Sequence, residues 1–331
     1  MPTPGSHVWR GMTACFLVSI GIQSAQAAQV TQVAEWPEKA TRIIVPFGAG
    51  SADTAARIIA DALRQRTGKV VVVENRPGAG QNVGAGVLYR ATPDGATIMV
   101  TAPGPLVINQ FIYPKLEFDP HAFTPVMLLT TDPLVFVVNA KSPFKTLQAF
   151  IDDAKKNPGK RTYGSAGAGA TSHMMTAILF AMAGVDVTHV PYKGGAESAL
   201  ALLSGHIDFL ASSPVTAVPQ IQGGTFRPLA VTAKAGMTVL PAVPPAAISG
   251  VPGYDYATWL AVVAPPKVAP AVAQRIADLI EDIFKSPEVR TRLSAFGSHY
   301  EGGGPQRLGN WIKDERVKWK ASVEAAGVKS Q

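Results

Sequence analysis

Cysteine is nearly missing from this 331-residue chain, which contains only Cys15. That residue lies near the start of an apolar N-terminal run, whereas a lipid-bearing cysteine would follow such a run, so we expect no lipid anchor. If this N-terminal segment is removed on export, the mature chain has no thiol. Disulfides, cysteine-based metal sites and thiol nucleophiles are thereby excluded.

Long apolar runs are also scarce, and the run most similar to a membrane helix in composition is Gly11–Ile22. It is too short to span a bilayer, follows the polar segment Met1–Arg10 and precedes the small-residue pattern Ala25-Gln26-Ala27. These features predict a secretory signal peptide over residues 1–27, removed after Ala27. We therefore expect a soluble mature protein in an exported compartment, the periplasm.

Charge is sparse as well, with 16% charged residues and a formal net charge of +7, which falls to +6 when Arg10 leaves with the signal peptide. The basic residues are scattered except in Lys313–Lys320, where a solvated helix face is the better interpretation than a nucleic-acid patch. We expect no nucleic-acid partner. A mildly basic balance suits small anionic ligands.

Glycine, by contrast, is plentiful and recurs between strands and helices. Arg42–Phe47 is an apolar strand, Gly48–Ser51 is a glycine loop, and the residues after it have helical spacing. Lys69–Glu74 has β-branched residues on both faces, as in a parallel strand covered on each side. A second glycine loop, Asn75–Gly86, leads to a short helix before the strand Thr97–Thr101. This repeat predicts an α/β doubly wound fold with ligands at the carboxyl ends of strands.

Another stretch of this kind, Thr162–Thr176, combines a strand end, a loop with three glycines and a helix start. Backbone N–H groups at a helix start have no partner within the helix and attract anions. The hydroxyls of Ser165, Thr171 and Ser172 add possible donors. The sequence predicts an anion site here, with a tight turn that binds nothing as the alternative.

The remaining elements follow from hydrophobic periodicity and from proline and glycine signals. We expect helix caps from Ser51 or Asp53 and from Thr171 or Ser172. Further strands are predicted within Phe123–Asn139 and at Val187–Pro191, Ile207–Ala211, Arg227–Thr232 and Thr258–Ala264. Further helices are predicted over Ser142–Asn157, Met174–Met182, Glu197–Ser204, Pro270–Phe284, Pro287–Phe296 and Pro305–Ala326.

Enzyme motifs are incomplete. Tyr163–Gly167 lacks the first glycine of G-x-S-x-G, no H-E-x-x-H occurs, and Gly84 follows Gly78-Ala79-Gly80 one residue too late for G-x-G-x-x-G. No metal or cofactor is expected. A secreted α/β hydrolase-like enzyme and a ligand-binding partner of a sensor both stay open as functions.

Four motifs occur in order along the chain: Ile44-Val45-Pro46-Phe47 with its loop through Asp53 and Arg57, Val73–Gly80, Tyr163–Gly167 through His173, and Val190-Pro191-Tyr192-Lys193-Gly194. Together they resemble the motifs of the substrate-binding receptors of tripartite tricarboxylate transporters, the Bug or TctC-like family. The later Gly205-His206-Ile207-Asp208 also fits, and the likeness runs from about Trp36 to the C-terminus.

This resemblance implies a type II periplasmic-binding fold of two doubly wound α/β lobes with a hinge. Lobe 1 would comprise residues 36–132 and 258–331, lobe 2 residues 133–257, with crossings near Pro133 and Tyr256–Trp259. The implied function is that of a monomeric extracytoplasmic receptor. It would close around a small organic acid between the lobes and deliver it to a membrane permease.

The resemblance also implies which loops touch the ligand, and several residues have a second interpretation. Asp53 either contacts a ligand amine or caps its helix, Asn82 reaches the cleft or stabilises a turn, and Asp208 contacts ligand or orients a loop. His173 and Lys193 have plain structural alternatives, as does Trp259 in the hinge core. The first loop has one residue fewer before its aspartate than is usual in the family. The implied ligand-binding residues are Gly48, Ala49, Gly50, Ser51, Asp53, Asn82, Ser165, Gly167, Ala168, Thr171, His173, Tyr192 and Asp208.

Overall fold

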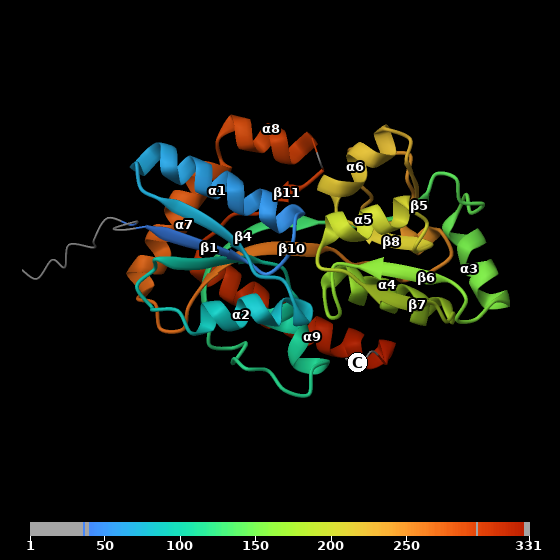
Figure 1. Ribbon diagram of the computed structural model, residues 1–331, viewed down its shortest axis with the longest axis horizontal. Helices are drawn as coiled ribbons and strands as arrows, with labels where there is room; N and C mark the ends of the chain where they lie inside the picture. Colours follow the sequence, from blue (N-terminus) through green and yellow to red (C-terminus); the bar gives the residue numbers. More distant parts are fainter. Residues whose placement is uncertain (1–35, 37–39, 296, 328–331) are drawn as a thin grey trace, which may run out of the picture. The chain divides into compact units, whose positions relative to one another are not determined.

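The computed structural model describes residues 36, 40–295 and 297–327. The predicted signal peptide lies outside these residues. The described residues form two β-sheets, each with helices on both faces (Figure 1). None of the helices within these ranges is long and apolar enough to cross a membrane.

The first sheet has six strands in the order β11-β4-β10-β3-β1-β2. Strand β1 pairs in parallel with β2 and β3, whereas β10 runs antiparallel between β3 and β4. We call the part of the chain built on this sheet lobe 1. Its strands are β1 (Thr41–Val45), β2 (Val71–Asn75), β3 (Thr97–Thr101), β4 (Thr124–Asp132), β10 (Thr258–Ala264) and β11 (His299–Tyr300).

The second sheet has five strands in the order β7-β6-β8-β5-β9, and we call the part built on it lobe 2. Strand β6 pairs in parallel with β7 and β8, and β5 runs antiparallel between β8 and β9. The strands are β5 (Val135–Asn139), β6 (Thr162–Ser165), β7 (Thr188–Pro191), β8 (Phe209–Ser212) and β9 (Phe226–Val231).

Both sheets therefore share one plan, in which three parallel strands are followed by an antiparallel strand that arrives from the other lobe. Strand β5 enters lobe 2 directly after β4, through Pro133, and β10 returns to lobe 1 after Tyr256. The predicted doubly wound α/β organisation is confirmed. The predicted division at residues 132/133 and 257/258 stays a prediction, because the described residues belong to one compact unit.

The helices follow from apolar residues at helical spacing, and α7 is typical. Its buried residues Ala273, Ile276, Ile280 and Ile283 lie on one face, and Pro270 occupies the first turn, where a missing N–H costs little. The helices are α1 (Ser51–Thr67), α2 (Asn82–Tyr89), α3 (Leu147–Lys156), α4 (Thr171–Ala183), α5 (Gly195–Leu203), α6 (Pro214–Gln222), α7 (Pro270–Phe284), α8 (Pro287–Ala295) and α9 (Pro305–Ala326). Shorter turns of helix are η1 (Ala79–Gln81), η2 (Gly104–Ile108), η3 (Asn109–Phe111) and η4 (Ala246–Ile248).

The hydrophobic core joins the two lobes on one side. One cluster contains Ile44 and Met99 of lobe 1, Phe136 and Phe209 of lobe 2, and Trp319 of α9. The opposite faces have separate clusters, with α1 and α7 packed on the sheet of lobe 1 and α5 and α6 on that of lobe 2. The continuous side therefore contains the hinge.

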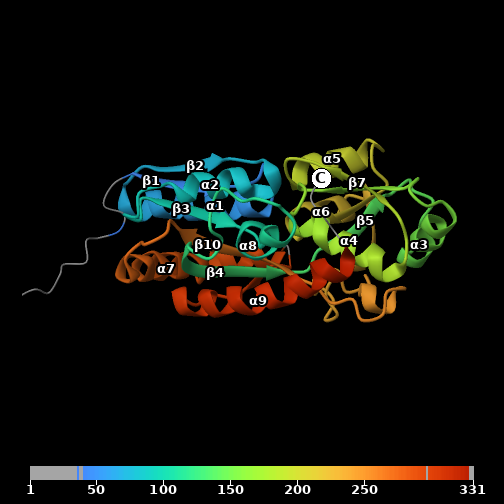
Figure 2. The same cartoon turned by 90° about the horizontal axis from the view of Figure 1, so that it is seen from below.

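Helix α9 forms a third connection across this side, as Figure 2 shows. Glu315 accepts hydrogen bonds from the indole N–H groups of Trp259 in β10 (2.8 Å) and Trp319 (2.9 Å). Farther along, the hydroxyls of Tyr256 and Ser322 lie 3.0 Å apart. Trp259 is 1% exposed, so it belongs to the hinge core.

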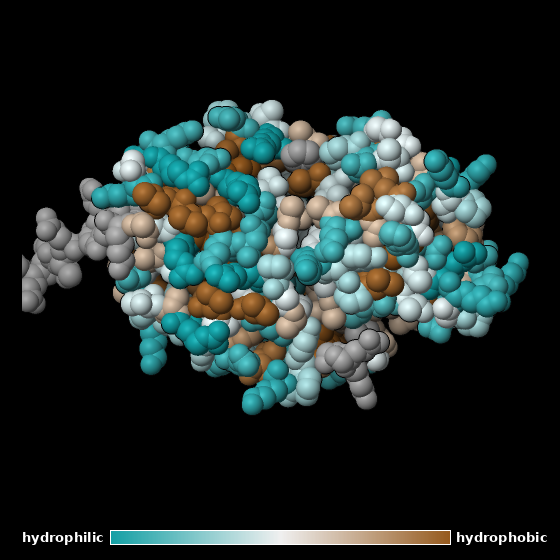
Figure 3. All heavy atoms as spheres, viewed as in Figure 1, coloured by the Kyte–Doolittle hydropathy of each residue, from teal (hydrophilic) through white to brown (hydrophobic). Residues whose placement is uncertain are grey.

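The surface carries few large apolar side chains. On the face drawn in Figure 3, apolar residues form separate patches among hydrophilic ones. One expectation is wrong at this surface: Val72 was predicted to be covered, yet it is 49% exposed. Strand β2 is at the edge of its sheet, so only one of its faces is well covered.

Candidate functional site

A cavity of about 90 Å³ lies between the lobes, several times the space that one water molecule needs (~10–15 Å³). It lies at the carboxyl ends of β1, β3, β6 and β8 and at the two crossings. Its lining residues are Phe47, Ala49, Gly50, Ser51, Ala52, Ala102, Asp132, Leu134, Ala166, Ala170, Thr171, Ser172, Gly195, Ser198, Ala211, Ser212, Ser213, Thr258 and Leu260. We call it the pocket.

Four helices begin at the pocket: α1 after Gly50, α4 after Ala170, α5 after Gly194 and α6 after Ser213. Among the described residues, the N-cap side chain at none of these four starts accepts a hydrogen bond from a backbone N–H of the first turn. The partial positive charge of each helix start therefore faces a shared space. Such an arrangement favours a small anion.

The predicted capping residues have other roles, and those predictions are wrong. Both helices begin earlier than expected, so Ser51 and Thr171 are already first-turn residues. Asp53 accepts two hydrogen bonds from Arg57 (2.9 and 3.0 Å) and one from Asn75 (2.9 Å). Its carboxylate ties α1 to the end of β2 and does not line the pocket.

Hydroxyl groups supply the side-chain polarity on the lobe 2 wall. The Thr171 hydroxyl is buried and has no hydrogen-bond partner among the described residues. Ser172 accepts a hydrogen bond from the Ala166 N–H (3.1 Å), and it also lines the pocket. A buried hydroxyl without a partner is costly unless a ligand or water supplies one.

Ser165 lies just behind this wall. It is fully buried, its hydroxyl is 2.7 Å from His189 Nε2, and it also donates to the Gly167 carbonyl (3.1 Å). His173 accepts the Gly169 N–H at Nδ1 (3.0 Å) and stacks on His189 with ring centroids 3.8 Å apart. Burial lowers the pKa of His173 to about 4, and burial and the neighbouring His173 lower that of His189 to about 3, so both rings are neutral at pH 7.

The Ser165–His189 pair therefore stabilises the glycine loop. A hydrolytic serine must reach its substrate, and the Ser165 side chain does not line the pocket. The geometry thus disfavours the hydrolase alternative.

The two lobes touch directly beside the pocket. The Gly48 N–H donates to the Lys193 carbonyl (3.0 Å), and the Ala196 N–H donates to the Ala49 carbonyl (3.3 Å). A Cβ atom on Gly194 would lie 3.1 Å from the Gly48 nitrogen, so this approach depends on glycine. Gly48 and Lys193 serve in this contact and do not line the pocket.

A second contact between the lobes lies near η1. The Tyr113 hydroxyl donates to the Ala168 carbonyl (2.9 Å), and that same carbonyl leaves no room for a Cβ on Gly80. Gly167 is close to Gly80 as well. Both Gly167 and Ala168 therefore contact lobe 1 rather than line the pocket.

Three further predicted residues lie outside the lining. Asn82 accepts a hydrogen bond from Asn109 Nδ2 (2.6 Å), as a turn-stabilising side chain would. Tyr192 packs with the cluster beneath α5 and α6, and its N–H donates to the Ser165 carbonyl (3.0 Å). His173 is buried behind the loop.

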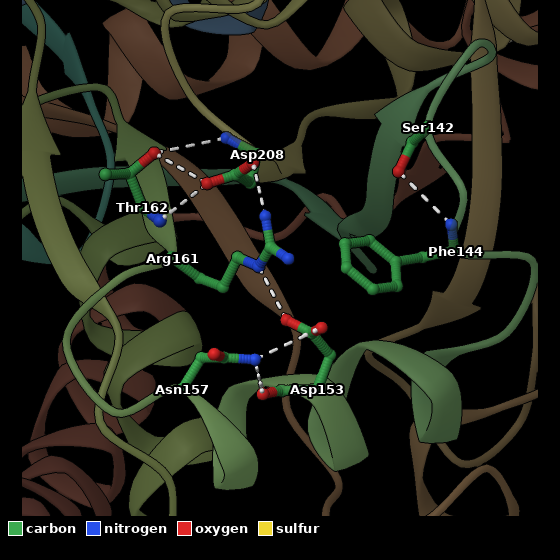
Figure 4. A network of polar contacts seen from close by, with 7 residues as sticks. All are labelled: Ser142, Phe144, Asp153, Asn157, Arg161, Thr162 and Asp208. Atoms are coloured by element: carbon green, nitrogen blue, oxygen red, sulfur yellow. Dashed lines mark hydrogen bonds and ion pairs between the residues drawn. The ribbon is translucent and has the colours of Figure 1, made fainter.

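Asp208 lies at the start of β8, whereas the pocket is at the end of that strand. Its carboxylate accepts from the Thr162 N–H (2.9 Å) and hydroxyl (3.2 Å), and Arg161 lies 3.7 Å away (Figure 4). Arg161 in turn bonds Asp153 of α3 (2.6 Å). Asp208 thus holds the start of β6, which matches its orienting interpretation.

Of the predicted residues, the structure brings Ala49, Gly50, Ser51 and Thr171 together at the pocket. Sequence reasoning missed several lining residues at or near the ends of strands and helices, namely Asp132, Ser198, Ser212, Ser213 and Thr258, whereas Ser172 was expected as a possible donor. A local signal exists for two of them, because Ser212-Ser213 stands between an apolar strand and a proline that can open a helix.

Asp132 is the only charged residue among the described residues that line the pocket. It is 3% exposed, and its Oδ2 accepts a hydrogen bond from the Thr130 hydroxyl (2.7 Å). Burial raises the pKa of Asp132 to about 6, and Thr130, Ser298 and the backbone and charge of His299 offset part of that rise. The carboxyl is mostly ionised at neutral pH.

Two α/β lobes, two crossing strands and a pocket between the lobes define a solute-binding protein with the type II periplasmic-binding fold. Residues 55–328 match the model of the tripartite tricarboxylate transporter family receptor, so the chain belongs to this receptor family. It is accordingly a receptor and not an enzyme.

Individual relatives agree with this assignment. A protein from the tcbD-tcbE intergenic region of Pseudomonas sp. strain P51 is 34% identical, with 87% of this chain and 86% of that protein covered. The solved structure of R. palustris Rpa4515 with adipate has a TM-score of 0.85 at 30% identity, and the match covers 89% of this chain and 99% of that one. The structure of MatC from Rhodopseudomonas palustris with bound malate has a TM-score of 0.83 at 28% identity, and the match covers 87% of this chain and 100% of that one.

Proposed function

We propose that this protein binds a small carboxylate in the pocket and delivers it to a tripartite tricarboxylate-type membrane transporter. One observation carries the proposal: four helix starts without side-chain caps surround a pocket whose described lining contains no Lys, Arg or His. Backbone N–H groups recognise a carboxylate by direction, and the surrounding dipoles favour its charge.

The ligand's carboxylate contacts the first turns of α1 and α4. Gly50 and Ser51 offer backbone donors from lobe 1, and Thr171 and Ser172 offer hydroxyls from lobe 2. Ser198, Ser212 and Ser213 complete the polar wall. The relatives solved with adipate and malate support a small organic acid as the ligand.

Binding is coupled to the approach of the lobes. The contacts of Gly48 with Lys193 and of Tyr113 with Ala168 form only when the lobes approach, so a ligand that touches both lobes favours the closed state. Water is then excluded from the pocket, which strengthens the hydrogen bonds inside it. A receptor that works in this way needs no chemistry on its ligand.

We also propose that the protein acts in the periplasm as a monomer. The predicted signal peptide and the membership of the receptor family support this location. N-terminal sequencing of the exported protein tests it, with Ala28 as the expected first residue. Sedimentation at micromolar concentration tests the oligomeric state.

The binding experiment is calorimetric titration of the exported protein with mono-, di- and tricarboxylates, aromatic acids and acidic amino acids. We expect at least one carboxylate to bind, and Thr171→Val with Ser172→Ala to weaken it about tenfold or more through loss of two hydroxyls. Ser249→Ala is the matched control, because its hydroxyl bonds Pro245 outside the pocket. Absence of binding by every acid, or unchanged affinity in the double variant, contradicts the proposal.

Delivery is tested separately by uptake of the labelled ligand into cells. Cells without the receptor should lose uptake, and the native protein should restore it. Uptake that continues undiminished without the receptor contradicts the transport role and favours a sensory one.

A further inference from the structure

Asp132 is an unusual neighbour for an anion, because it is a buried acid in a pocket built from helix starts. It is the last residue of β4, opposite Thr258 of β10 in the sheet, at the point where the chain crosses to lobe 2. Both Asp132 and Thr258 line the pocket. The carboxyl group thus lies at the hinge end, on the crossing strands.

One oxygen of this carboxyl group lacks a partner. Oδ2 accepts the Thr130 hydroxyl, whereas Oδ1 has no hydrogen-bond partner among the residues that the structure describes. Asp132 separates the pocket from a smaller cavity of about 20 Å³ that Thr130, Ser298 and Arg292 line. Asp132 lines both cavities, whereas Thr130, which bonds Oδ2, and Ser298, which lowers the pKa of Asp132, line only the smaller one.

A buried, ionised oxygen without a donor is expensive to maintain. Burial holds the pKa of Asp132 near 6, so the group accepts hydrogen bonds at neutral pH. A ligand carboxylate beside it would be repelled. The two ends of the pocket therefore demand opposite chemistry, an anion at the helix starts and a hydrogen-bond donor at Asp132.

Resting on the proposed function, we propose that Asp132 is a specificity residue that selects carboxylates bearing a hydroxyl or ammonium group, which donates a hydrogen bond to Oδ1. The ligand class is then hydroxy- or amino-carboxylates rather than plain carboxylates. A hydroxyl would donate one hydrogen bond, and an ammonium group would add charge attraction.

A purely structural role for Asp132 would have a different signature. In that case its carboxyl would only tie Thr130 to the hinge, and substitution would change the affinity of all ligands alike. A specificity role instead separates ligands by whether they carry the donor. Ligands matched in chain length distinguish the two roles.

The test is calorimetric titration at pH 7.5 with two matched sets, succinate, malate and aspartate, and glutarate, 2-hydroxyglutarate and glutamate. In the set that binds, we expect a donor-bearing acid to bind about tenfold or more tightly than the plain diacid. Asp132→Asn should weaken the donor-bearing acid and leave the plain diacid equal or tighter, because the repulsion is gone. Asp61→Asn, an exposed acid on α1, is the control with the same change of charge.

Equal affinity for plain and donor-bearing acids in the native protein overturns the inference. So does an Asp132→Asn variant that changes all members of a set by the same factor. If neither set binds but another carboxylate does, the inference also fails while the proposed function stands; if no carboxylate binds, the proposed function itself fails. Thermal melting of the ligand-free variant controls for folding, and we expect no loss of stability because the substitution removes a buried charge.

Discussion

Asp208, just before β8, and Asp132, the last residue of β4, differ in how the surrounding residues satisfy their carboxylates. Asp208, in the outer network of Figure 4, accepts two hydrogen bonds from Thr162 and lies beside Arg161. Asp132, at the pocket, is more deeply buried and has one oxygen without a partner. The outer network satisfies its polar groups internally, whereas the pocket leaves groups to be satisfied by a ligand.

The largest expected effect concerns stability and pH at Asp132. An aspartate ionises near pH 4 in an unfolded chain, whereas burial raises the pKa of Asp132 to about 6. The folded state binds this proton more tightly than the unfolded chain does. The protonated carboxyl therefore contributes its full share to the free energy of unfolding below about pH 4, and this contribution is lost as pH rises through 6. The total change is about 3 kcal/mol.

Urea denaturation of the native protein and of Asp132→Asn at several values between pH 4.5 and 7.5 measures this. The variant should lack that part of the pH dependence and gain stability over the native protein as pH rises. His299, which helps to lower the pKa of Asp132, and Arg292, which lines the smaller cavity, are unchanged in both proteins. Parallel pH profiles would show that Asp132 is not the titrating group.

In the outer network we expect substitution of an acid to lower stability rather than to raise it. Asp208→Ala removes the acceptor of the Thr162 N–H and should lower the free energy of unfolding by about 1–3 kcal/mol. Ligand affinity should stay within about twofold, because Asp208 is at the far end of β8 from the pocket. Urea denaturation and calorimetry on the same sample test both statements. A large loss of affinity would contradict the claim that the outer network supports stability and not ligand binding.

A smaller effect is expected where the lobes touch. Gly194 has an extended backbone that any residue can adopt, yet a Cβ there would press on the backbone of Gly48 at 3.1–3.3 Å. Gly194→Ala should therefore leave unfolding nearly unchanged and weaken ligand binding severalfold, up to about tenfold, by opposing the approach of the lobes. Calorimetry gives the affinity, with Gly205→Ala, where a Cβ meets nothing within 4 Å, as a control for the glycine change itself.

Gly205 has a positive φ of 74°, so this control variant should lose some stability while it keeps its affinity. Loss of affinity in Gly205→Ala equal to that in Gly194→Ala would contradict a specific role for the contact between Gly194 and Gly48.

The smallest effect is expected for Tyr113→Phe. This change removes one hydrogen bond between the lobes, to the Ala168 carbonyl, and leaves the ring in place. Loss of about 0.5–1.5 kcal/mol from the closed state should weaken binding severalfold or less. An affinity equal to that of the native protein would show that this hydrogen bond is not specific to the closed state.

Much of the fold could be predicted from the sequence because its elements carry strong local signals. Residues 97–101 and 258–264 were predicted as strands and residues 270–284 and 305–326 as helices, and the structure has the same bounds. Helix α6 was not predicted, because Pro219 lies inside it and a proline within a helix normally interrupts the helix. The exposure of Val72 depends on strand order, which no local pattern reveals.

The candidate site could be predicted only in part. The glycine loops before α1 and α4 are local features, and residues 49–51 and 171 do line the pocket. Asp132 and Ser198 reach it because separate strands and helices end at one place, which depends on tertiary structure. His173 and Tyr192 belong to the predicted motifs, but His173 is buried in α4 and Tyr192 packs against the core of lobe 2.

The most direct test of the central claim is a crystal structure of the exported protein with a carboxylate that binds in solution. We expect the carboxylate oxygens within about 2.7–3.2 Å of backbone nitrogens or hydroxyls at the starts of α1 and α4, with no Lys, Arg or His in contact. A carboxylate held by a basic side chain, or bound outside the pocket, would contradict the account.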